Sequence, residues 1–93
     1  MKKTLVVDNH PVMLRFMKNL LEKHGYEVRT AEDGLSALDV LKAYRPEVIF
    51  TDLIMPNIDG EKLCRIVRGT PELENAYLIV LSSIAGEEDV DFA

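Results

Sequence analysis

Several short apolar segments of the sequence end in residues with oxygen-bearing side chains. Asp8 and Asn9 follow the first such segment, Asp52 follows a later one, and Ser82 follows the last. Carboxylate and amide oxygens suit a hard cation such as Mg²⁺, which proteins usually hold with one or two carboxylates plus water and phosphate oxygens. An aspartate beside a cation can also be a nucleophile that forms an acyl phosphate, with a nearby hydroxyl bound to one of its oxygens. These residue types therefore suit a cation site or phosphoryl chemistry, provided that the segments meet in space.

Each of these residues also has an ordinary structural explanation. Asp and Asn after a strand are common helix caps and turn residues, so Asp8 or Asn9 could cap a following helix while also serving a site. Asp59, beside Gly60, is explained as a turn or N-cap residue, and His10 is assigned a capping or packing role at a helix start. The chemical interpretation therefore depends on the whole set.

The pattern of apolar residues predicts strands that alternate with helices. Strands are predicted at 4–7, 26–31, 47–52 and 77–83, and helices within 10–25, 33–46 and 61–68. Apolar residues at helical spacing are expected to face the core: Met13, Phe16, Met17, Leu20 and Leu21 in the first helix, Leu35, Leu38 and Leu41 in the second, and Leu63, Ile66 and Val67 in the third. Such an alternation predicts an open α/β fold, a parallel sheet with helices on both faces, whose strands all end at one edge.

Composition narrows the function classes. The chain of 93 residues is one domain at most, and 11 Lys and Arg against 16 Asp and Glu give a formal net charge of -5. That sign disfavours direct binding to nucleic acid or to an anionic membrane. The single Cys64 excludes an internal disulfide, and the N-terminus has neither a signal-peptide core nor a spanning segment, so a cytoplasmic location is expected.

In this order and spacing, four motifs resemble the receiver domain of two-component response regulators over essentially the whole chain: LVVDNHP, TDLIMPNIDG, AEDGLSAL and IVLSS. The resemblance implies a five-stranded flavodoxin-like fold in which Asp52 accepts a phosphoryl group from the phosphohistidine of a sensor histidine kinase. It further implies Mg²⁺ held by Asp8, the Asn9 position, Asp52 and the backbone carbonyl of Ile54. Ser82 takes the role of the switch hydroxyl, and an output domain or effector protein reads the switched state.

The sequence departs from the family pattern in two ways. Asn9 stands where the family usually has a second acidic residue, so Mg²⁺ is expected to bind weakly. The sequence given ends at Ala93, before the fifth strand, the last helix and the pocket lysine of the family, and no lysine present occupies a matching place. Residues 1–93 are thus expected to be a receiver domain incomplete at its C-terminus, either a fragment of a longer protein or a short form completed by a partner chain. The fourth strand would then be an apolar sheet edge, and a homodimer through that edge is one expectation.

Two other function classes remain open at this point. One is a receiver-like interaction module that works without phosphorylation, which Asn9 and the missing lysine favour. The other is an aspartate-nucleophile phosphatase, but such enzymes normally carry a second Asp two residues after the nucleophile, where this chain has Ile54. The sequence therefore favours a signalling module over an enzyme.

Overall fold

A computed structural model describes residues 2–52 and 60–81. Strands and helices alternate along these residues as the sequence predicts, with one additional short 3₁₀ helix before the last strand. The elements are β1 (Lys3–Val7), α1 (Pro11–Lys23), β2 (Glu27–Ala31), α2 (Gly34–Ala43), β3 (Val48–Asp52), α3 (Gly60–Arg68), η1 (Pro71–Leu73) and β4 (Tyr77–Leu81). No helix among the described residues has the length and apolar character needed to cross a membrane.

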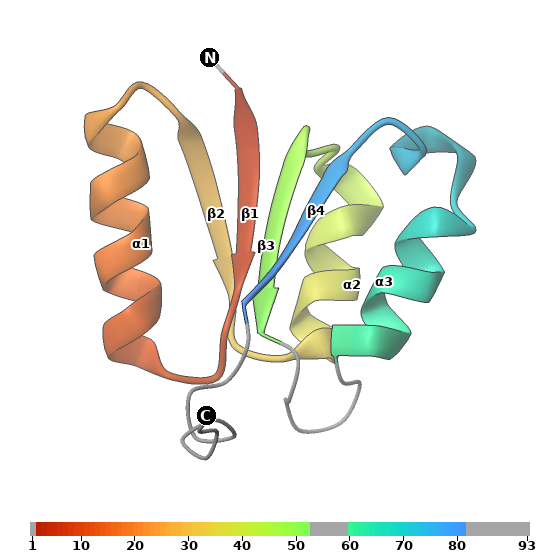
Figure 1. Cartoon of the computed structure of the whole chain (residues 1–93), viewed down its shortest axis with the longest axis horizontal. Coiled ribbons are helices and arrows are strands. Elements are labelled where there is room, and N and C mark those ends of the chain that lie inside the picture. The colour runs from red at the N-terminus through yellow and green to blue at the C-terminus, as the bar shows by residue number, and fades with distance from the viewer. Residues whose placement is uncertain (1, 53–59, 82–93) are drawn as a thin grey trace, which may run out of the picture.

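The four strands form one parallel sheet in the order β2-β1-β3-β4. Helix α1 lies on one side of the sheet, whereas α2 and α3 lie on the other (Figure 1). In the register of the central pair, Val7 lies opposite Thr51, so β1 and β3 end side by side. The predicted parallel α/β architecture is confirmed, and it places the carboxyl ends of the strands at a common edge.

The hydrophobic core lies on both faces of the sheet because the central strands carry apolar side chains on each face. On β1, Leu5 and Val7 belong to the cluster that packs against α2 and α3, whereas Val6 belongs to the cluster under α1. Ile49 on β3 and Leu63 on α3 are also fully buried in the first cluster. The continuous apolar runs seen in the sequence are therefore strands covered on two sides.

Local sequence signals explain where the helices begin and end. Pro11 occupies the first turn of α1, where its missing N–H is not needed. Gly25 follows that helix with a φ of 89°, a left-handed conformation that glycine adopts without steric cost. Asp33 caps α2, and its carboxylate accepts a 2.8 Å hydrogen bond from the backbone N–H of Ser36.

Tyr44 closes the end of the sheet opposite to the strand carboxyl ends. Its hydroxyl donates a 3.2 Å hydrogen bond to the carbonyl of Glu27, and the guanidinium of Arg29 lies 4.7 Å from the ring centroid. Burial, followed by the nearby Glu27 charge, raises the pKa of the Tyr44 hydroxyl above its ordinary value of 10.0. The side chain thus links the end of α2 to β2 through a hydrogen bond and a cation–π contact.

The predicted core face of α1 is partly wrong. Met13, Phe16 and Leu20 are 42%, 58% and 40% exposed, and the buried residue of this helix is Leu14. In the other two helices, Leu35 and Ile66 also remain exposed, whereas their neighbours on the predicted faces pack inward. The expected residues are apolar, but the described part of the sheet does not cover them all.

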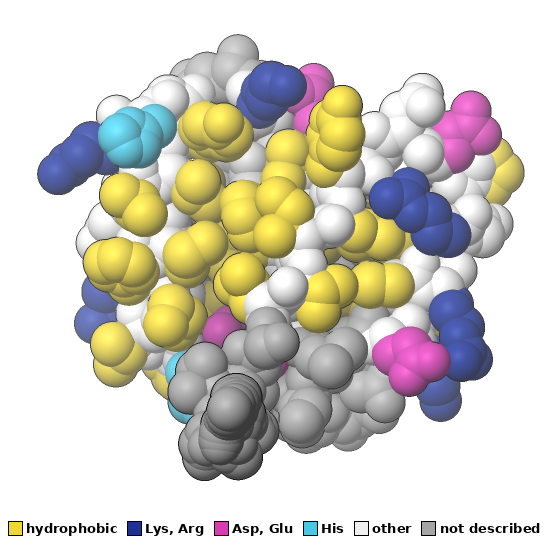
Figure 2. Space-filling model, viewed as in Figure 1, with side chains coloured by type: hydrophobic (Ala, Val, Ile, Leu, Met, Phe, Trp, Pro, Cys, Tyr) yellow, Lys and Arg dark blue, Asp and Glu magenta, His cyan; other side chains and the backbone are white. Residues whose placement is uncertain are grey.

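Besides these residues of α1, the described residues of β4 expose large hydrophobic side chains: Tyr77, Ile79 and Val80. Hydrophobic side chains spread across the face between the two elements (Figure 2). Contiguous apolar surface of this kind is characteristic of an interaction site.

Candidate metal centre at the carboxyl edge of the sheet

Two carboxylates lie together where β1 and β3 end. Asp8 directly follows β1 and Asp52 is the last residue of β3, and the two residues are only 7% and 5% exposed. The backbone N–H of Asp8 donates a 3.1 Å hydrogen bond to the carbonyl of Ala31, which extends the pairing of β1 with β2 by one residue. The sheet therefore fixes the main chain beneath both side chains.

Asp8 also organises the turn that leads into α1. Its Oδ1 accepts a 2.9 Å hydrogen bond from the backbone N–H of His10, and His10 Nδ1 lies 2.9 Å from the same oxygen. His10 is the N-cap residue of α1, yet its side chain makes no capping hydrogen bond with the helix. The imidazole is instead directed to the carboxylate of Asp8, so the capping role expected for His10 does not describe its side chain.

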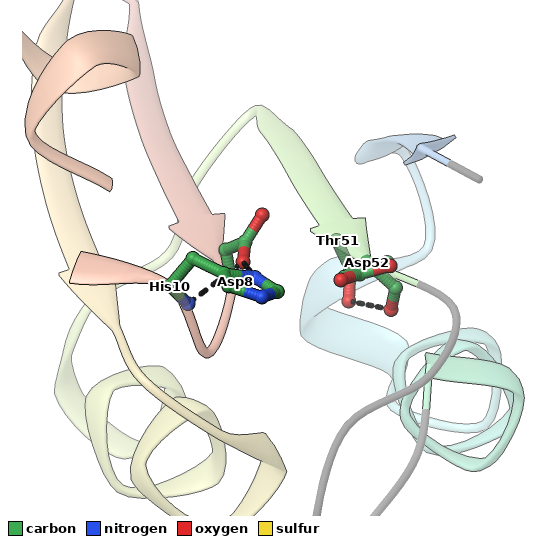
Figure 3. Close-up of polar contacts among 4 residues, drawn as sticks. All are labelled: Asp8, His10, Thr51 and Asp52. Atoms are coloured by element: carbon green, nitrogen blue, oxygen red, sulfur yellow. Dashed lines mark hydrogen bonds and ion pairs between the residues drawn. The ribbon is translucent and has the colours of Figure 1, made fainter. Parts of the chain in front are cut away.

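Asp8, His10 and Asp52 together form a set of side chains that could hold a metal ion. One ligand atom from each side chain lies within 4.8 Å of the corresponding atoms of the other two. Figure 3 shows these side chains gathered at the ends of β1 and β3. Two buried carboxylates at this separation repel each other unless a positive charge is nearby, so the donor set fits a divalent cation.

The main chain at Asp52 has a further support. Thr51 is fully buried, and its hydroxyl donates a 3.0 Å hydrogen bond to the carbonyl of Asp52 (Figure 3). Asp52 also lies opposite Leu81 in the pairing of β3 with β4. The carboxylate at the strand end is consequently held on a backbone with little freedom to shift.

The structure accounts for some of the predicted site residues. Asp8 and Asp52 are brought together as expected, and Asn9 beside them is exposed. Ile54, Ser82 and Asp59 lie outside the described residues, so their expected roles stay predictions. Sequence reasoning missed His10 as a candidate ligand. A histidine two residues after the first carboxylate was the available signal, but the direction of its ring depends on the turn.

The strand order and the helices on both faces define the flavodoxin-like topology, in which functional residues gather at the carboxyl edge. The sequence profile described as "Response regulator receiver domain" matches residues 4–93. The chain belongs to the response regulator receiver domain family. A signal receiver domain of a histidine kinase from Syntrophus aciditrophicus superposes with a TM-score of 0.85 at 32% identity, covering 97% of this chain and 68% of that one.

Other relatives place the match within longer proteins. Protein PilG of Pseudomonas aeruginosa is 34% identical over 84 residues, which make up 90% of this chain and 62% of PilG. The sensor histidine kinase RcsC of Escherichia coli is 41% identical over 64 residues, 69% of this chain and 7% of RcsC. The response regulator TrrA of Thermotoga maritima, solved in complex with Mg²⁺ and BeF, has a TM-score of 0.81 at 31% identity, covering 97% of this chain and 77% of that one. The chain thus spans less than two thirds of the length of PilG and of RcsC.

Proposed function

We propose that this chain is a phosphoacceptor module of a two-component phosphorelay and that Asp52 is the acceptor. The observation that carries the proposal is the position of Asp52, buried at the carboxyl edge of a receiver fold with Asp8 and His10 beside it. Asp52 ends the strand β3, which is hydrogen-bonded on both sides within the sheet. A nucleophile on a rigid strand end is held in one orientation toward an incoming phosphoryl group.

The proposed reaction uses an oxygen of the Asp52 carboxylate as the nucleophile. This oxygen forms a bond to phosphorus while the bond between phosphorus and the histidine nitrogen of the donor breaks, and the released imidazole takes up a proton. A divalent cation, when bound, neutralises the charge on the transferring phosphoryl group. Asp8 and Asp52 would hold that cation, together with the expected carbonyl of Ile54 and the oxygen of Asn9. Mg²⁺ is expected to bind weakly because Asn9 adds no charge.

The proposal includes partners for both sides of the relay. A sensor histidine kinase supplies the phosphoryl group. Because such kinases use ATP, we expect the relay to operate in the cytoplasm. Ser82 is the expected switch hydroxyl, and an output domain or effector protein reads the change. The relatives support this arrangement because they include a response regulator and a sensor histidine kinase by name. The module itself signals and is not proposed to be an enzyme.

The test is phosphoryl uptake by the chain from a small donor. Incubation with Mg²⁺ and acetyl phosphate should add the mass of one phosphoryl group to the wild type and none to Asp52→Asn. Asp39→Asn is a matched control because Asp39 is an exposed aspartate on α2, paired with Lys42 at 3.2 Å and outside the Asp8, His10 and Asp52 set. If the wild type takes up no phosphoryl group, or Asp52→Asn takes it up equally, the proposal is wrong. The first result would favour a phosphorylation-independent interaction module.

A homodimer through the β4 edge is a separate part of the proposal. Within the described residues β4 pairs only with β3, and its exposed side chains Tyr77, Ile79 and Val80 are apolar. A strand edge of this composition favours pairing with another chain. Sedimentation should therefore show a concentration-dependent dimer that Ile79→Lys weakens. A monomer at all concentrations would exclude this interface.

A further inference from the structure

His10 brings a nitrogen ligand to a site for which oxygen ligands alone were expected. Its Nδ1 lies 2.9 Å from Asp8 Oδ1, and one of its ring nitrogens lies within 4.8 Å of a carboxylate oxygen of Asp52. The side chain of His10 is 69% exposed, whereas that of Asp8 is 10% exposed. The imidazole therefore stands at the mouth of the site, over two buried carboxylates.

The spacing of these atoms agrees with octahedral coordination. Ligands about 2.1 Å from a small divalent ion are about 3 Å apart when adjacent and about 4.2 Å apart when opposite. The 2.9 Å between His10 Nδ1 and Asp8 Oδ1 matches the adjacent distance. The upper limit of 4.8 Å for the set exceeds the opposite distance by an amount that small side-chain rotations would close. One ion could therefore contact all three groups without movement of the strands.

The type of donor atom decides which ion binds more tightly at this site. Carboxylate and carbonyl oxygens suit Mg²⁺, whereas an imidazole nitrogen suits the later divalent ions of the first transition row. A nitrogen that binds a metal must be unprotonated. His10 Nδ1 would therefore lose its hydrogen bond to Asp8, and the neutral imidazole would carry its proton on Nε2. Coordination would thus replace one contact between His10 and Asp8 by two contacts to the same ion.

We propose that His10 is a direct metal ligand and that it shifts the selectivity of this site from Mg²⁺ toward later transition-metal ions such as Co²⁺. The proposal concerns the same site as the proposed phosphoacceptor function. The metal preference does not depend on that function, whereas its role in signalling does. His10 is the residue that determines the metal preference, while Asp8 and Asp52 bind either class of ion.

The experiment measures metal binding by the 93-residue chain without any phosphodonor. Dissociation constants for Co²⁺ and Mg²⁺ are obtained by calorimetry, and the absorption spectrum of Co²⁺ reports nitrogen coordination directly. His10→Ala should weaken Co²⁺ binding about tenfold or more while leaving Mg²⁺ binding nearly unchanged. The chain has one other histidine, His24, at the end of α1, so His24→Ala is the matched control and should leave both constants unchanged.

Two further variants separate ligation from positioning. His10→Asn keeps a side-chain donor for Asp8 but removes the ring nitrogen, so Co²⁺ binding should stay weak if His10 is a ligand and recover if it only orients Asp8. Asp52→Asn should also weaken Co²⁺ binding, since the three groups share one ion. Equal losses of Co²⁺ and Mg²⁺ affinity in His10→Ala, or no loss of either, would overturn the proposal. A chain that shows the predicted selectivity but takes up no phosphoryl group would disprove the phosphorelay function alone.

Discussion

Replacing Asp52 by Asn should stabilise the fold when no divalent cation is bound. Oxygens of Asp8 and Asp52 lie no more than 4.8 Å apart, and both residues are more than nine-tenths buried. With an effective dielectric constant of about 20, two unit charges at that distance repel each other by about 3 kcal/mol. The hydrogen bonds that Asp8 accepts from His10 offset part of this repulsion. We therefore expect the free energy of unfolding to rise by about 1–3 kcal/mol.

Urea unfolding followed by circular dichroism, with a chelator present, measures this change. Asn is nearly isosteric with Asp, so the variant removes the charge and leaves the packing. Asp39→Asn removes an exposed charge of the same kind and should change the free energy of unfolding by less than about 0.5 kcal/mol. Saturating Mg²⁺ should then stabilise the wild type more than Asp52→Asn. A variant that unfolds at the same or a lower urea concentration than the wild type would refute the electrostatic reasoning.

Three other changes test the fold by urea unfolding. Leu63→Ala should lower the free energy of unfolding by about 2–5 kcal/mol, because it empties a fully buried position in the core. Asp33→Ala should cost about 1 kcal/mol by removing the cap of α2, and Asp33→Asn, which still accepts the hydrogen bond, should cost less. The raised pKa of Tyr44 means that the folded state holds this proton more tightly than the unfolded state, so stability should fall as the pH rises above about 10. Tyr44→Phe should flatten that fall, whereas Tyr77→Phe, at an exposed ring, should not.

The fold could be predicted because its determinants are local. Apolar runs such as the one ending at Val7 stop at polar residues, and helical stretches end at glycine or proline, so each element is encoded within its own residues. Parallel pairing then follows from the alternation of strands and helices. The burial of α1 could not be predicted in the same way. Phe16 has the correct spacing for a core residue, but its exposure depends on how far the sheet extends beneath the helix.

The same distinction between local sequence signals and tertiary contacts applies to the candidate site. The meeting of Asp8 with Asp52 follows from strand topology, because the carboxyl ends of neighbouring parallel strands share one edge. The position of the His10 ring does not, because it depends on a turn in which Asp8 accepts a hydrogen bond from the main chain of His10. Side-chain directions in such turns are set by tertiary contacts that residue spacing alone does not encode.

The central place of β1 has a consequence for how the chain folds. Strand β1 comes before β2 and β3 in the chain, yet it pairs with both of them, with Lys3 opposite Glu27 and Thr4 opposite Val48. A nascent chain therefore carries this apolar strand unpaired until much of the domain has left the ribosome, and closing these long loops makes folding slow. The strand that leads directly to the first carboxylate of the site is thus also the one that must wait for both of its partner strands.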